Sequence, residues 1–198
     1  RLIVLPHNPP KEYAVQPIIL NAGCGRSGPE RLPPMFGGWR HMRVDIDPQA
    51  QPDVVADITD LSPFNDNFAD ALWTSHCVEH LFQHQVRQAL SEFLRVLKPD
   101  GFAVILVPDV QVIARYVAED RLHEVLYESP AGPITAHDIL FGHGDSIEQG
   151  NLHMAHRTAF TPSSIIAAMQ DAGFADIAIR RRPGLELACV GRKTAHHD

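Results

Sequence analysis

The sequence of 198 residues predicts one α/β domain built on a mainly parallel β-sheet. The apolar run 18–20 leads into a turn with two glycines one residue apart, Gly23 and Gly25. This pattern is typical of a buried parallel strand that ends in a loop which another molecule approaches closely. A second apolar run, about twenty residues later, ends in an acid, Asp45. Further short apolar runs alternate with amphipathic helical segments, as in an α/β fold.

The two strand ends together indicate a bound nucleoside, because an acid at the tip of the second strand can hold the two hydroxyls of a ribose. Residues 23–28 also match the G-x-G-x-x-G pattern of dinucleotide-binding folds. That site places a pyrophosphate on the N-terminus of a helix that starts at the loop. Here Pro33 and Pro34 would break such a helix. A nucleoside-containing cofactor without a phosphate therefore fits better.

The first half of the chain continues with short strands and one clear helix. Residues 1–16 carry three prolines and are predicted to form an extended N-terminal arm. Strands are predicted over 53–58, 69–76 and 103–108. The helix before the last of these has one apolar face. That face consists of Val86, Leu90, Phe93, Leu94 and Leu97.

The second half is predicted to hold two helices, a long irregular segment and a hairpin. An amphipathic helix is predicted over 110–127. A second helix begins at Thr161, a favoured N-cap followed by proline, and ends at Gly173. Residues 175–182 and 185–192 flank a Pro-Gly turn and are predicted to pair as a hairpin.

Residues 128–160 show no strong periodicity and contain several glycines and prolines. Loops of this length in a compact domain are usually functional or disordered. Disordered segments are poor in aromatic and apolar residues, whereas this one is rich in them and in histidine. It holds His137, Phe141, His143, His153, Met154, His156 and Phe160. We therefore expect an ordered substrate cap with a short helix near 136–141.

Composition limits the partners and the compartment. The net charge of −7 and the lack of a dense basic face argue against nucleic-acid binding. No apolar run approaches the roughly 20 residues that span a bilayer. The three cysteines, Cys24, Cys77 and Cys189, are odd in number and far apart, which favours free thiols in a reducing, cytoplasmic location. The oligomeric state is left open.

Five motifs in a fixed order carry a resemblance to a known family. They are the glycine loop, Val-Asp at 44–45, Ala-Asp-Ile at 56–58, Ser-His-x-x-Glu-His-Leu at 75–81 and Leu-Lys-Pro-x-Gly at 97–101. Over residues 18–192 the chain resembles the class I S-adenosylmethionine-dependent methyltransferases, in their small type 11-like branch.

The resemblance implies a single-domain Rossmann-like fold over 17–198, with the cap at about 128–160. Its seven-stranded sheet would be mainly parallel with an antiparallel last strand and helices on both faces. The expected function is methyl transfer from S-adenosylmethionine to a small-molecule or saccharide acceptor. One alternative is a nicotinamide-dependent oxidoreductase, which the broken first helix disfavours. Another is a non-catalytic S-adenosylmethionine-binding protein. Asn21 stands where the family usually has an acid, and Ser27 stands at the family's third glycine position, with Gly28 one residue late.

The resemblance also assigns cofactor contacts. The glycine loop would take the methionine half, Asp45 the ribose and Asp57 the adenine amino group, with Ile58 beside the ring. Ser75 and His76 would lie under the sulfonium. The full implied set is Asn21, Ala22, Gly23, Cys24, Gly25, Asp45, Ile46, Asp57, Ile58, Ser75 and His76.

The histidines raise two further hypotheses. Residues 76–80 match the zinc-peptidase pattern H-x-x-E-H, but His76 is predicted to end a strand, so His76 and His80 would not share a helical face. His153 and His156 are half of a metal pattern at best, and we expect no metal. By residue type, His153 and His156 are instead the candidate general bases for an acceptor whose proton must be removed.

Overall fold

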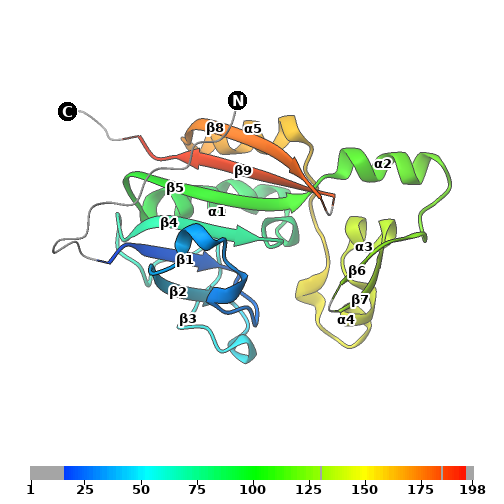
Figure 1. Ribbon diagram of the computed structural model, residues 1–198, viewed down its shortest axis with the longest axis horizontal. Helices are drawn as coiled ribbons and strands as arrows, with labels where there is room; N and C mark the ends of the chain where they lie inside the picture. The colour runs from blue at the N-terminus through cyan, green and yellow to red at the C-terminus, as the bar shows by residue number, and fades with distance from the viewer. Residues whose placement is uncertain (1–15, 130, 184, 195–198) are drawn as a thin grey trace.

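The computed structural model describes residues 16–129, 131–183 and 185–194. Except for its last residue, the predicted N-terminal arm lies outside the described part of the chain. Figure 1 shows one large sheet with helices behind it and a smaller group of elements, α2 to α4 with a two-stranded sheet, beyond one end of the strands. Among the described residues, none of the helices has the length and apolar composition needed to cross a membrane.

The sheet has seven strands in the order β3-β2-β1-β4-β5-β9-β8. They are β1 (Ile18–Ala22), β2 (Arg40–Asp45), β3 (Val54–Val55), β4 (Ala69–Ser75), β5 (Leu97–Pro108), β8 (Ala175–Arg182) and β9 (Glu186–Arg192). The first five pair in parallel, whereas β9 is antiparallel to both β5 and β8. This confirms the predicted mainly parallel sheet with an antiparallel last strand. Strand order reverses between β1 and β4, the point where such sheets bind ligands.

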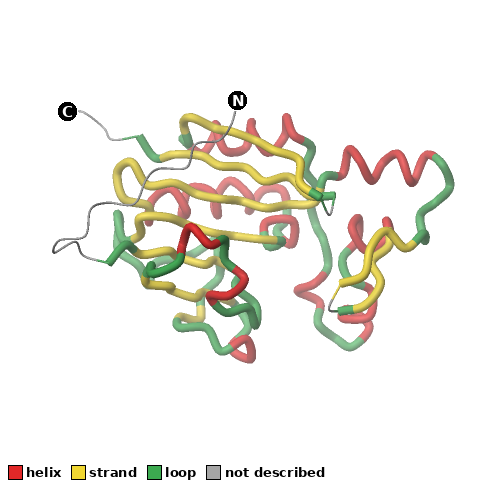
Figure 2. Tube along the Cα trace, in the orientation of Figure 1, coloured by secondary structure: helices red, strands yellow, loops and turns green. Residues whose placement is uncertain are grey.

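Two long helices, α1 (Gln83–Val96) and α5 (Pro162–Ala172), cover one face of the sheet (Figure 2). The apolar side chains of both helices join alternate residues of β1, β4, β5 and β9 in the main core. Phe93 and Met169, one from each helix, are fully buried there. Thr161 caps α5 by accepting from the Ser164 N–H, and Gly173 ends it, as predicted.

The opposite face is covered differently from our expectation of helices on both faces. Two 3₁₀ turns, Pro29–Arg31 and Pro34–Phe36, follow the glycine loop where the fold would place its first helix. Phe36 packs there against Trp73 and Phe102 of the sheet. The prolines fix the backbone and remove donors, so no continuous helix forms.

Three predicted elements have other bounds in the structure. The strand expected over 53–58 is reduced to the two residues of β3, Val54–Val55. The helix expected over 110–127 ends at Ala118, so α2 is Val110–Ala118. The chain turns at Asp120, which takes a left-handed φ of 56°, and then forms the hairpin β6 (Val125–Ser129) and β7 (Gly132–Thr135). Strand β5 starts at residue 97 rather than 103, with an irregular stretch before Phe102 joins the ladder.

The residues between β5 and α5 form the cap. After the hairpin come α3 (Ala136–Phe141), which the sequence predicted, α4 (Gly144–Glu148) and a 3₁₀ turn, Leu152–Met154. We call this segment, residues 110–160, the cap; it contains the substrate cap predicted at about 128–160, whose role stays a prediction. Its own apolar cluster is built on Ile113, Ile134, Ala136 and Ile139.

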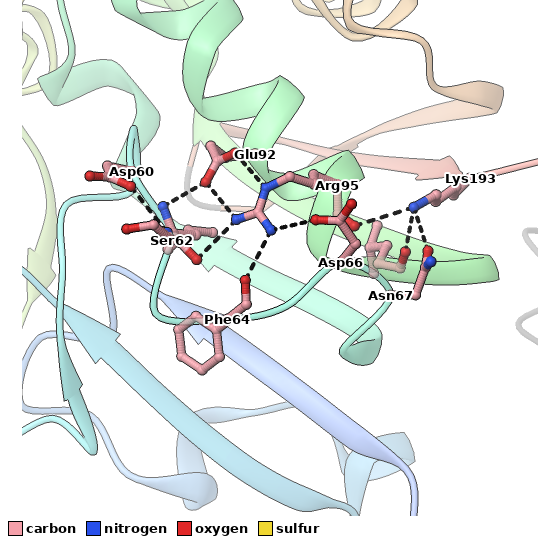
Figure 3. Close-up of polar contacts among 10 residues, drawn as sticks. Asp60, Ser62, Phe64, Asp66, Asn67, Glu92, Arg95 and Lys193 are labelled. Carbon is pink, nitrogen blue, oxygen red and sulfur yellow. Dashed lines mark hydrogen bonds and ion pairs between the residues drawn. The ribbon is translucent and has the colours of Figure 1, made fainter.

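A partly buried network of hydrogen bonds and ion pairs ties the loop before β4 to α1 (Figure 3). The Arg95 guanidinium donates to both carboxylate oxygens of Glu92, at 2.7 and 2.8 Å, and to Asp66 at 2.8 Å. It also donates to the backbone carbonyls of Phe64 and Leu61, at 2.9 and 3.0 Å. Glu92 in turn accepts from the Leu61 N–H at 2.7 Å. This loop carries the chain from Asp57 back into the sheet.

Candidate functional site

The glycine loop follows β1 at the carboxyl edge of the sheet. The N–H groups of Gly23 and Cys24 both donate to the Val44 carbonyl, at 2.9 and 3.0 Å, which fixes the loop against β2. Gly23 has φ 71°, and a Cβ there would overlap Sγ of Cys77. Gly25 has φ 52°, and a Cβ there would meet no atom of the described residues within 4 Å. Packing therefore requires glycine at 23, whereas the open space above Gly25 leaves room for a ligand.

Asp45 joins the second strand to that loop. Its Oδ2 accepts from the Gly25 N–H at 2.7 Å, and its Oδ1 accepts from the Asp47 N–H at 2.9 Å. A carboxylate has about four acceptor sites, so each oxygen keeps capacity for a hydroxyl. The next residue, Ile46, is 44% exposed and offers an apolar surface beside the acid. This pair suits a ribose with its attached base.

Asp57, which follows β3, is arranged as expected for a contact to the adenine amino group, whereas Ile58 is not exposed as expected. Oδ1 of Asp57 accepts from the backbone N–H and the hydroxyl of Thr59, at 2.9 and 2.8 Å. In the described part of the chain no donor is found on Oδ2, which can accept from an amino group. Ile58, however, is 6% exposed and packs in the main core. Its side chain is therefore turned mainly into the core, whereas the more exposed apolar side chain at this edge is that of Ile46.

Most of the other implied contacts can be made only by the backbone. The side chains of Asn21, Ala22 and Cys24 are buried, with 4%, 0% and 5% exposure. Burial also raises the pKa of the Cys24 thiol, which keeps it protonated and unreactive. Ser75 ends β4 and is half-buried.

His76 sits between two carboxylates that the sequence pattern did not bring together. Its Nε2 lies 2.9 Å from Oε2 of Glu186, and its Nδ1 lies 3.3 Å from Oε1 of Glu79. Burial would lower the pKa of His76, but the two carboxylates outweigh it and raise the pKa to about 10. His76 is therefore an imidazolium at the carboxyl end of β4. Its backbone has a left-handed φ of 51°.

A cavity of about 130 Å³ opens between this edge of the sheet and the cap. Four histidines line it, His76, His80, His143 and His156, together with Tyr127, Asp138 and apolar residues of the cap. His76 and Pro108 bring the ends of β4 and β5 to its wall. Of the two predicted bases, His156 lines the cavity, whereas His153 is exposed and lies outside the lining.

Four residues around His76 and the cavity were not among the predicted site residues: Glu79, His80, Glu186 and Tyr127. Glu79 and His80 belong to the H-x-x-E-H pattern, which did single them out but for another chemistry. Glu186 is 110 residues from His76 along the chain, so no local signal could have paired them.

Comparisons with known proteins agree with this geometry. Residues 20–105 match the model of a methyltransferase domain. This match confirms the resemblance to class I methyltransferases and, with it, S-adenosylmethionine as the expected cofactor. A search of curated protein sequences found no match to this chain.

Solved structures with similar folds include three bacterial and archaeal proteins. A possible exported protein from Bordetella parapertussis has a TM-score of 0.57 and 18% identity, covering 91% of this chain and 63% of that one. A 1,6-didemethyltoxoflavin-N1-methyltransferase from Burkholderia thailandensis, with bound S-adenosylhomocysteine, has a TM-score of 0.55 and 20% identity, covering 91% and 72%. A SAM-dependent methyltransferase from Archaeoglobus fulgidus has a TM-score of 0.59 and 17% identity, covering 90% and 86%. Identities at this level show a shared fold.

Proposed function

We propose that this chain transfers a methyl group from S-adenosylmethionine to a small-molecule or saccharide acceptor held in the cap cavity. The observation that carries the proposal is the placement of that cavity at the carboxyl ends of β4 and β5, because β4 is the neighbour of β1, the strand that leads into the glycine loop. An acceptor in the cavity and a cofactor along the strand ends would then meet near His76.

When bound, the cofactor supplies a methyl group on a positively charged sulfur, which oxygen, nitrogen or carbon nucleophiles can attack directly. The protein therefore contributes mainly orientation and exclusion of water. Asp45 would accept from the ribose hydroxyls, Asp57 from the adenine amino group, and Ile46 would pack against the adenine. The backbone of residues 21–25 would line the methionine half.

The cap supplies the acceptor side. His156 is the predicted base that lines the cavity, and Tyr127 and Asp138 give it further polar groups. The small volume, about 130 Å³, favours a small acceptor over nucleic acid. The three free thiols support the expected cytoplasmic location.

Calorimetric titration separates this function from its alternatives. We expect S-adenosylhomocysteine to bind with a Kd on the order of micromolar and NAD to give no heat of binding. Tight NAD binding without binding of the S-adenosyl compound would replace the proposal with an oxidoreductase. A methyl-release assay, with labelled cofactor and a panel of phenols, amines and sugars, then tests turnover. Binding without turnover on any acceptor would favour a non-catalytic cofactor-binding protein.

A further inference from the structure

Three side chains, two of which line the cap cavity, bring possible metal-ligand atoms close together. Glu79 and His80 belong to the 3₁₀ turn Val78–His80 that follows β4, and His156 comes from the irregular segment between the 3₁₀ turn Leu152–Met154 and α5. One ligand atom from each lies within 4.8 Å of the others. The rings of His80 and His156 meet edge to face with centroids 4.8 Å apart.

Glu79 is the unusual member of this cluster. Its side chain is 1% exposed, and within the described residues neither carboxylate oxygen has a hydrogen-bond partner. The nearest cation, Nδ1 of His76, lies 3.3 Å from Oε1, which is within ion-pair distance but outside hydrogen-bond geometry. Burial of a carboxylate is costly unless it is paired and fully hydrogen-bonded. The acceptor sites left on the Glu79 carboxylate would therefore be stabilised by a further cation.

The two histidines are oriented to supply lone pairs. Nδ1 of His80 lies 3.2 Å from the Ala155 carbonyl, and Nδ1 of His156 lies 2.8 Å from the Ile139 carbonyl. A carbonyl only accepts, so each Nδ1 must carry the proton and donate. Nε2 of both rings is then unprotonated in the neutral form. Metal-binding histidines are held in this way, with the second ring nitrogen donating to a backbone carbonyl.

We propose that Glu79, His80 and His156 bind a divalent transition-metal ion of the Zn²⁺ class. Two imidazoles and one carboxylate suit such ions, and sites with three protein ligands keep an open position. Because His80 and His156 line the cavity, that position faces it. A metal there would polarise an oxygen of a bound molecule as a Lewis acid. His156 would use its lone pair for the metal and would not serve as a general base.

This site differs from the zinc-peptidase pattern and from our expectation that no metal binds. Both nitrogens of His76 face carboxylates, Glu79 and Glu186, so His76 supplies no ligand. The third ligand comes instead from the cap. The proposal does not depend on methyl transfer, because binding is measured without cofactor or acceptor.

The test is metal titration of the full chain after treatment with a chelator. We expect calorimetry with Zn²⁺ to give one ion per chain, and Co²⁺ to give the visible absorption of a tetrahedral site. Glu79→Gln and His156→Ala should each weaken binding by about 100-fold or more, beyond the 10–100-fold typical of losing a partner that only orients a ligand. His153→Ala is the matched control, an exposed histidine on the same segment, and should keep full affinity.

A folding control keeps the test decisive. Zn²⁺ should raise the melting temperature of the wild-type chain and of His153→Ala, because a ligand that binds the native state stabilises it. It should not raise that of His156→Ala. If Glu79→Gln does not fold, His80→Ala takes its place. The proposal is overturned if no stoichiometric binding occurs, or if the variants at 79, 80 and 156 bind as tightly as His153→Ala does.

Discussion

Oδ2 of Asp45 accepts a hydrogen bond from the backbone N–H of Gly25 at 2.7 Å. The acid at the tip of β2 thus holds the glycine loop that follows β1. Cofactor contacts assigned to two separate strands are therefore parts of one hydrogen-bonded unit.

Asp45→Ala should weaken binding of S-adenosylhomocysteine by about 1.5–3 kcal/mol, the scale of losing hydrogen bonds to a charged group. We expect the chain to stay folded, because Asp45 lies at a strand tip and not in the core. Asp53→Ala is the matched control, since Asp53 also accepts a backbone N–H, that of Arg43 at 2.8 Å. Calorimetry on both variants checks this, and equal affinities would refute the ribose role.

The two glycines of the loop should respond differently to alanine. Both have left-handed φ, which costs a residue with a Cβ about 1–2 kcal/mol. Gly23→Ala also forces a Cβ into Cys77, and overpacking adds about 1–3 kcal/mol. The added Cβ of Gly25→Ala meets no neighbour among the residues that the structure describes, so this variant should lose less stability.

Denaturant unfolding measures that difference, and calorimetry should show that folded Gly25→Ala binds S-adenosylhomocysteine more weakly. The double variant Gly23→Ala, Cys77→Gly should recover part of the lost stability, because both overlapping atoms of Cys77 are removed. Equal losses in the two single variants would contradict the packing argument.

Removal of the Arg95 side chain should destabilise the fold. Arg95→Met leaves the carbonyls of Leu61 and Phe64 without this donor and Glu92 without its cation. We expect a loss of about 1–3 kcal/mol in the free energy of unfolding. Arg121→Met is the control, because Arg121 makes the same kind of bonds to Glu119 and Glu124 but at an exposed site, where ion pairs add little. A similar loss in both variants would show that burial does not matter here.

The same network predicts acid sensitivity. The Arg95 hydrogen bond is the main cause that lowers the pKa of Glu92 below its ordinary value of 4.5. A carboxyl with a lowered pKa in the folded state adds stability that is full above the unfolded value and disappears as the pH falls through the folded one. Unfolding free energies measured from neutral pH to below 4.5 should therefore fall more steeply for wild type than for Glu92→Gln. Parallel curves would disprove the assignment.

Local signals in the sequence were sufficient for much of the fold. The N-cap at Thr161, the stop at Gly173 and the Pro-Gly hairpin depend on backbone preferences of a few neighbouring residues, which act wherever the segment lies. The prolines at 33 and 34 likewise excluded a helix without reference to the rest of the molecule.

Features that depend on distant partners were not predictable. The apolar pattern of 110–127 continues past the true end of the helix. The helix stops early because the chain turns at Asp120, and the later apolar residues belong to a strand that pairs with β7. The sequence motif suggested Ile58 as a ligand contact, but its side chain is buried in the main core. The cluster at Glu79 requires a histidine from the cap, and only the folded chain places it there.

The cap leaves the sheet and returns at nearly the same point. The Val110 N–H donates to the Phe160 carbonyl at 3.1 Å, and Asp109 and Phe160 form a parallel bridge. Every residue proposed to hold the cofactor lies outside 110–160. An insert whose ends are hydrogen-bonded to each other can be lengthened, shortened or exchanged with little strain on the scaffold. Under the proposed function, this architecture would let acceptor choice diverge by recombination at one junction, and the same junction would be the graft point for engineering a new acceptor specificity.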